Sequence, residues 1–155
     1  MKITRTANKY VFQLGKREKR LLFDLLQLYP CVPSTHQRLS KSKLPDREAN
    51  QHLLDEALAE HRAENKKQLL ALLSDPRRSK ETESGHRLAL SEADLEWLLQ
   101  ILNDIRVGSW LLLGAPELKL DFGGLNARNA PHFWAMEMAG QFQMQFIEAL
   151  GSDSL

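Results

Sequence analysis

Apolar residues recur at helical spacing along much of the chain. In the first of these stretches, Leu22, Leu25, Leu26 and Tyr29 are three or four residues apart, and the pattern stops before Pro30. Proline disfavours helical geometry in the residue before it, so a helix is expected to end there. A second, longer helix is expected from Asp46, which is a good N-cap residue, to about residue 73.

The strongest start signal belongs to the next helix. Ser91 and Asp94 have the spacing of a capping box, and Leu90 and Leu95 have the positions of a hydrophobic staple. Gly114, followed by Ala-Pro, ends this helix. The sequence therefore predicts a helix from about residue 92 to residue 113.

A final helix and a short hairpin complete the predicted elements. Asn129 and Pro131 open the helix, and Gly151 closes it. Near the N-terminus, β-favouring residues 3–6 and 10–14 are separated by a turn-forming Ala-Asn-Lys, which predicts a small hairpin.

The connecting segments are polar or rich in Pro and Gly. Residues 30–45 are expected to form a loop, residues 75–87 a mobile loop, and residues 115–128 an irregular crossing. The expected fold is mainly α: one domain over residues 1–155, built as a helical bundle of four or more helices with a small N-terminal hairpin.

Composition indicates a cytoplasmic protein. The single cysteine, Cys31, has no internal disulfide partner, which suits a reducing compartment. The first residues contain no apolar run typical of a secretory signal. The most apolar window, residues 97–113, contains Asn103, Asp104 and Arg106, so it is not expected to span a membrane.

Charge is distributed unevenly along the chain. Residues 1–43 carry ten Lys/Arg and two acids, a balance of +8, whereas residues 44–155 have a balance of −7. The basic segment could bind nucleic acid, or it could lie against the acidic remainder of its own fold.

Asp104 and Arg106 are unusual because they interrupt the apolar run. On a helical wheel they point about 160° apart, so they cannot pair with each other. Neither has an opposite charge three or four residues away, so each is expected to contact another element. The candidate partners are Asp24 and Glu137 for Arg106, and Arg17 and Arg20 for Asp104. Alternatively, Arg106 could bind an anion in a pocket, since a guanidinium suits that role.

Two polar residues fall on the leucine stripe of the long helix. His61 and Asn65 could face a pocket and, with Arg106 and Asp104, bind a carboxylate or phosphate. The alternative is that the middle of this helix overhangs the core and that His61 is solvated.

The final helix has too much apolar surface for an ordinary surface helix. Its polar residues form one narrow stripe, and apolar residues occupy two sides. Either the helix is central and enclosed, or its second apolar face is an interface. The candidate partner-binding residues on that face are Phe133, Met136, Met144 and Ile147.

The run Leu-Asn-Asp-Ile-Arg at residues 102–106, together with the aromatic last helix, resembles a bacterial family of mainly helical proteins of unknown function that share a Leu-Asn-Asp-Leu-Arg core motif. The resemblance implies a helical, cytoplasmic protein. Some members of that family are encoded beside an adaptor of an ATP-dependent protease, which implies a link to protein quality control.

No metal-ligand spacing, phosphate-binding loop or nucleophile elbow is present in the sequence, so no metal, cofactor or catalytic residue is predicted. The expected function is a non-catalytic protein-interaction or regulatory module, with another protein or a second copy of the chain as partner. Two alternatives remain: a small-anion binder or enzyme that uses Arg106 and His61, and a weak nucleic-acid-binding regulator that uses the basic N-terminal segment.

Overall fold

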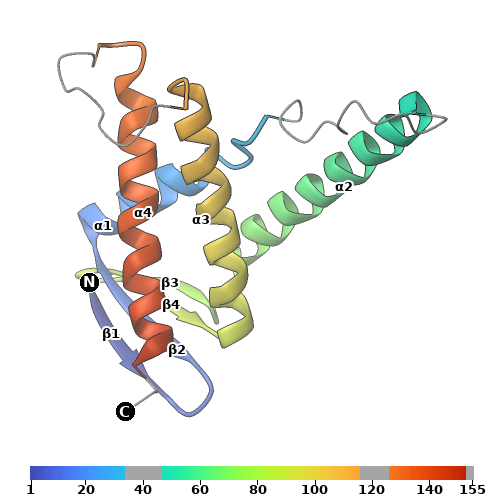
Figure 1. Ribbon diagram of the computed structural model, residues 1–155. Helices are drawn as coiled ribbons and strands as arrows, with labels where there is room; N and C mark the ends of the chain where they lie inside the picture. Colours follow the sequence, from blue (N-terminus) through green and yellow to red (C-terminus); the bar gives the residue numbers. More distant parts are fainter. Residues whose placement is uncertain (34–46, 116–125, 153–155) are drawn as a thin grey trace.

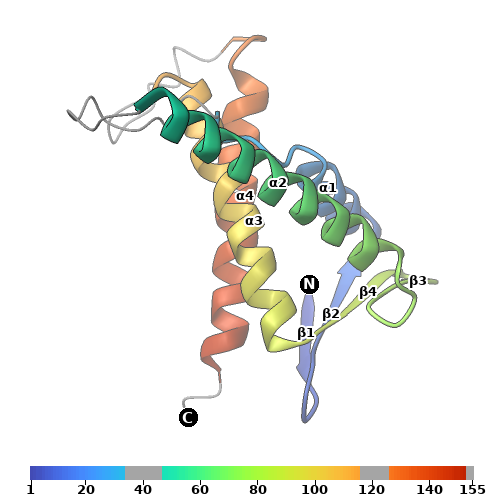
Figure 2. The same ribbon diagram turned by 90° about the vertical axis from the view of Figure 1, so that its right-hand side faces the viewer.

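The structure is a computed structural model, and it describes residues 1–33, 47–115 and 126–152. Four helices in these ranges make the chain mainly helical, as predicted: α1 (Lys16–Leu26), α2 (Arg47–Ser74), α3 (Glu92–Leu112) and α4 (Ala130–Gly151). Helices α3 and α4 lie side by side and run in opposite directions, whereas α2 projects away from this pair (Figures 1 and 2). Because of this divergence, the predicted bundle of four or more helices is not confirmed.

A four-stranded antiparallel sheet accompanies the helices. It contains β1 (Lys2–Arg5), β2 (Tyr10–Gly15), β3 (Ser79–Thr82) and β4 (Gly85–Leu90) in the order β1-β2-β4-β3. The predicted N-terminal hairpin is confirmed as β1–β2. The prediction of a mobile loop over residues 75–87 was wrong for about half of its length, because β3 and the first half of β4 occupy it.

The polar local sequence conceals why β3 and β4 form a hairpin. Strand β4 pairs with both β2 and β3, and its alternate residues His86, Leu88 and Leu90 are buried. Strand β3 is polar because it forms the edge of the sheet. At the start of β4, a Cβ on Gly85 would overlap the backbone oxygen of Leu14, so the close approach of β4 to β2 requires glycine there.

The hydrophobic core joins the sheet to the helices. It combines side chains of β2, β4, α1, α3 and α4, and Phe12 on β2 packs edge-to-face on Phe146 of α4 with ring centroids 4.9 Å apart. Among the described residues of α2, Leu69 and Leu72 are buried in the core and Leu73 packs against it, all near the C-terminal end of the helix. Its N-terminal half lies outside the core, and Leu53 there is 61% exposed.

Local signals place the helix ends close to where the sequence predicts them. The Ser91 hydroxyl accepts a hydrogen bond from the N–H of Asp94 at 3.0 Å, and the Asp94 carboxylate accepts one from the N–H of Ser91 at 3.2 Å. Helix α3 ends before Gly114, whose φ of +89° favours glycine. Helix α1 ends earlier than predicted, at Leu26. The predicted N-cap Asp46 lies outside the described residues.

Candidate functional site

Asp104 binds a backbone segment rather than a basic side chain. Its carboxylate accepts hydrogen bonds from the N–H groups of Cys31 at 2.6 Å and Val32 at 3.4 Å. The predicted partners Arg17 and Arg20 were therefore wrong for Asp104. The expectation that Asp104 contacts another part of the chain is confirmed, since residues 31 and 32 follow α1.

Gly108 lies one turn after Asp104 and meets the same backbone. A Cβ on Gly108 would overlap the main chain and Cβ of Cys31, so glycine is needed for α3 to approach this closely. The Cys31 thiol donates a hydrogen bond to the carbonyl of Leu28. Burial, assisted by the Asp104 carboxylate and opposed by Lys66, raises the pKa of this thiol to about 11. Cys31 is therefore a poor nucleophile near neutral pH.

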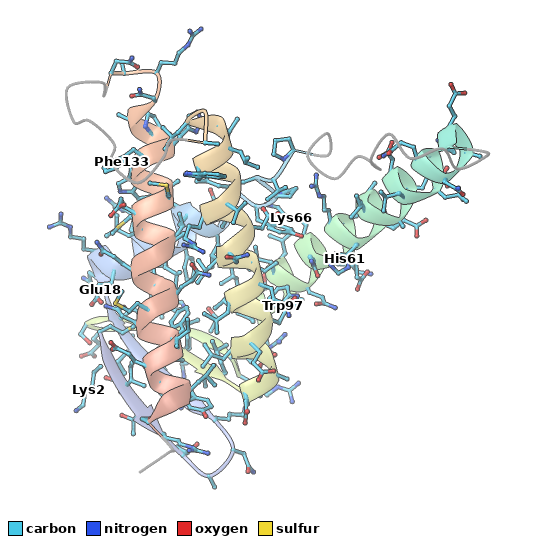
Figure 3. The ribbon with its side chains drawn as sticks, viewed as in Figure 1. Lys2, Glu18, His61, Lys66, Trp97 and Phe133 are labelled. Carbon is cyan, nitrogen blue, oxygen red and sulfur yellow. The ribbon has the colours of Figure 1, made fainter. Side chains whose placement is uncertain are left out.

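Helix α2 holds the same segment, residues 27–32, from its other side. The Asn65 amide donates a hydrogen bond to the Tyr29 hydroxyl at 3.0 Å, and its oxygen accepts one from the Trp97 ring N–H at 3.2 Å. Lys66 donates to the backbone carbonyls of Gln27 and Tyr29. Figure 3 shows His61 and Lys66 on α2, on the side of the molecule where Trp97 of α3 lies. The hydrogen bonds of Asn65 and Lys66 fix the position of α2 relative to α3 and to the segment that follows α1.

The four predicted ligand-binding residues thus divide into two places. His61 and Asn65 are adjacent, with His61 Nε2 3.2 Å from the Asn65 amide nitrogen, and Asn65 and Asp104 both bind the 27–32 segment. Arg106 does not join them. It is exposed, and its guanidinium donates a hydrogen bond to Asn103 on the same helix at 3.3 Å.

The predictions for Arg106 also need correction. Within the described residues it forms no ion pair with Asp24 or Glu137, the two expected partners. Asp24 lies in a different groove, beside α1. Glu137 does line the same groove as Arg106.

That groove lies between α3 and α4 and has a volume of about 670 Å³. We call it the α3–α4 groove. Arg106 lines it from α3, and α4 contributes Met136, Glu137, Gly140, Met144, Ile147 and Glu148. It therefore combines apolar side chains with charges of both signs.

Helix α4 has one buried and one exposed apolar face. Ala135, Ala139, Phe142 and Phe146 are buried against the rest of the fold. On the second face, Met144 is 63% and Ile147 is 56% exposed, while Phe133 and Met136 are half-buried. The sequence left open whether α4 is enclosed on nearly all sides or leaves its second apolar face uncovered. In the described structure the second face is uncovered.

The basic N-terminal residues form a mixed groove rather than a uniformly positive one. Lys16, Lys19 and Arg20 of α1 line a groove of about 390 Å³ together with Asp24 and Glu81. The first α1 turn also contains Glu18, whose carboxylate pairs with the N-terminal amine at 2.9 Å.

A buried Ser–His pair was not anticipated. Ser79 Oγ and His86 Nε2 are 2.6 Å apart, both residues are 7% exposed, and His86 Nδ1 has no hydrogen-bond partner among the described residues. Burial, together with Lys19 and against the effect of Glu81, lowers the pKa of His86. The alternation His86-Leu88-Leu90 was the one sequence signal that could have identified the strand and its buried histidine. A neutral, enclosed histidine of this kind supports the packing of the hairpin.

Similarity to known proteins points to no further site. Comparisons of the chain with protein-family models, curated protein sequences and solved structures found no significant match. The resemblance of residues 102–106 to a bacterial family therefore stays an expectation. In the described ranges, no group of three or more His, Cys, Asp or Glu side chains could hold a metal ion, and no helix is both long and apolar enough to cross a bilayer.

Proposed function

We propose that this protein is a non-catalytic protein-interaction module and that the exposed apolar face of α4 is its binding surface. The observation that carries the proposal is the exposure of Met144 and Ile147 beside the α3–α4 groove. Large apolar side chains grouped on one helix face are typical of interfaces, and methionine adapts its shape to a partner.

The polar groups favour this proposal over an anion-binding site or an enzyme. Of the four candidate ligand-binding residues, Asp104 and Asn65 use their hydrogen bonds within the fold. Arg106 borders the α3–α4 groove, while His61 lies on α2 beside Asn65. A site that needs Arg106 and His61 together is therefore not supported by this geometry.

Site-specific photo-crosslinking tests the proposal. Benzoylphenylalanine at position 147 should give discrete adducts with a partner protein when cells that produce the chain are irradiated, and a Met144→Glu change in the same chain should abolish them. The matched control is benzoylphenylalanine at position 53, because Leu53 on α2 is a comparably exposed apolar residue, at 61%. Equal adducts from both positions, or none from position 147, would contradict the proposal.

A further inference from the structure

We propose that the tip of the β3–β4 hairpin, residues 80–87, opens away from α1 when His86 binds a proton. This tip has two unlike surfaces. Residues 80–84 are all exposed, whereas the side chain of His86, two positions later, is enclosed. A titratable group is thus buried under a short piece of chain that already lies in solvent on its other side. The inference goes beyond the proposed function, because it concerns a different part of the molecule.

Three elements enclose the imidazole of His86. Its Nε2 atom lies 2.6 Å from Ser79 Oγ on β3, and the Phe23 ring on α1 packs edge-to-face on it with ring centroids 5.0 Å apart. On β2, the buried and uncharged Leu14 is opposite His86 in the strand pairing. The imidazole can therefore reach solvent only when the hairpin tip and α1 separate.

The neutral imidazole suits this enclosure, and the protonated one does not. A neutral ring has one N–H donor and one acceptor nitrogen, and the Ser79 hydroxyl can pair with either form of Nε2. An imidazolium has two N–H donors. Its second donor is on Nδ1 of His86, which is buried and has no hydrogen-bond partner among the described residues. Protonation therefore adds a buried, charged donor without an acceptor, and this disfavours the closed hairpin.

The charged groups that act on His86 come from α1 and β3. The Lys19 ammonium on α1 lies 4.7 Å from the centroid of the Phe23 ring, and it opposes a positive charge on His86. The Glu81 carboxylate, on the β3 residue opposite His86, favours that charge. Burial and Lys19 together outweigh Glu81 and hold the pKa of His86 below 6.5. The open hairpin loses the burial, so it binds the proton more readily and gains population as the pH falls.

Opening can stay local because His86 lies next to the turn of an edge hairpin. Strand β3 is at the edge of the sheet, and the core residues of β4, Leu88 and Leu90, come after the tip. Small peripheral units of a fold open more readily than the whole molecule. Glu81 and Gly85 line the groove of about 390 Å³ along α1, so opening removes one wall of that groove. The pH therefore controls the shape of the groove.

Hydrogen exchange of the whole chain between pH 8 and pH 5.5 tests the inference. Protection factors, which are corrected for the intrinsic exchange rate at each pH, should fall several-fold for the backbone N–H groups of residues 80–87. The fall should not exceed about tenfold, because the open state gains a factor of about ten for one pH unit below 6.5. The matched control is the β1–β2 hairpin, which also has a four-residue edge strand and contains no histidine. Its protection should fall less.

Substitutions identify the titrating group. His86→Gln keeps a hydrogen-bonding group beside Ser79 but does not titrate, so residues 80–87 should have the same protection at both pH values. Lys19→Met should reduce the fall, because it removes a charge that opposes the imidazolium. Lys16→Met is the matched control, since it removes the same charge from another position on the same groove, and it should leave the fall unchanged.

A measurement on the wild-type chain covers the case in which His86→Gln does not fold. NMR titration of the His86 ring should give a midpoint below pH 6.5, and protection of residues 80–87 should decrease as the pH falls below 6.5. Any of four results would overturn the inference: a midpoint at or above 6.5, free exchange of residues 80–87 already at pH 8, equal falls in the two hairpins, or a fall that persists in His86→Gln.

Discussion

The carboxylate of Asp104, on α3, accepts a hydrogen bond of 2.6 Å from the backbone N–H of Cys31, a residue that lies 73 positions earlier in the chain. The same carboxylate reaches Val32, and Gly108 leaves room for the main chain at this point. Asp104 therefore holds the segment between α1 and α2 against α3.

Replacing Asp104 should destabilise the protein. Asp104→Ala leaves two backbone N–H groups without their charged acceptor, and hydrogen bonds to charged groups contribute about 1.5–3 kcal/mol each. We expect the free energy of unfolding, measured by urea denaturation, to fall by about 2 kcal/mol. The control is Asp55→Ala on α2, where the carboxylate accepts a hydrogen bond from the exposed Gln51 side chain; a loss as large as that of Asp104→Ala would argue against the proposed role of Asp104.

Two Gly→Ala changes should have opposite effects. Gly108→Ala places a methyl group on the Cys31 backbone and should cost about 1–3 kcal/mol, as overpacking does. Gly140→Ala places its methyl group 3.8 Å from Cδ of Arg106 and should stabilise the monomer by up to about 1 kcal/mol, because alanine favours a helix. Thermal unfolding at a concentration too low for self-association measures both. Loss of stability in Gly140→Ala would contradict the open space above this glycine.

Asn65 should matter for stability more than for ligand binding. Asn65→Leu leaves the Tyr29 hydroxyl and the Trp97 ring N–H without their partner, which should cost about 1–3 kcal/mol in urea unfolding. His61→Ala, at an exposed position, should change the free energy of unfolding by less than about 0.5 kcal/mol. Calorimetric binding of inorganic phosphate by the wild type, abolished in both variants, would instead favour the anion site.

His86 should make stability depend on pH. Because burial keeps the pKa of His86 below its ordinary value of 6.5, the unfolded chain binds this proton more readily than the folded one. The contribution of neutral His86 to the stability of the folded state is present in full above pH 6.5, and it is lost as the pH falls below that value. We expect the free energy of unfolding to decrease from pH 8 towards pH 5, and to decrease less in His86→Gln, which keeps a hydrogen-bonding group beside Ser79 but does not titrate. Identical pH profiles for the two proteins would show that His86 does not contribute.

The basic segment should bind nucleic acid poorly. Asp24 and Glu81 lie in the same groove as Lys16, Lys19 and Arg20, so phosphate groups would meet carboxylates there. Mobility shifts with duplex DNA at about 50 mM salt, where phosphate contacts are strongest, should show no micromolar binding. Tight binding that weakens steeply with added salt would favour the nucleic-acid alternative.

Much of the secondary structure follows from local sequence. The Ser91–Asp94 capping box, the end of α3 just before Gly114 and the β1–β2 hairpin depend on residues a few positions apart, so their signals can be read directly. The two apolar faces of α4 are also visible in the sequence, because a helical wheel fixes the direction of each side chain. For the same reason, the opposite directions of Asp104 and Arg106 were predictable.

What lies opposite each side chain was decided by the tertiary structure alone. A wheel cannot show that Asp104 meets the backbone of Cys31 and Val32, since backbone N–H groups carry no sequence signal and these are more than 70 positions away. The first half of strand β4 lies in a stretch that reads as polar, and pairing with β2 buries His86 there together with Leu88 and Leu90. The sequence likewise left open whether the second face of α4 is enclosed. The packing of α1, α3 and the sheet against the first face alone leaves Met144 and Ile147 exposed, because burial depends on which elements meet.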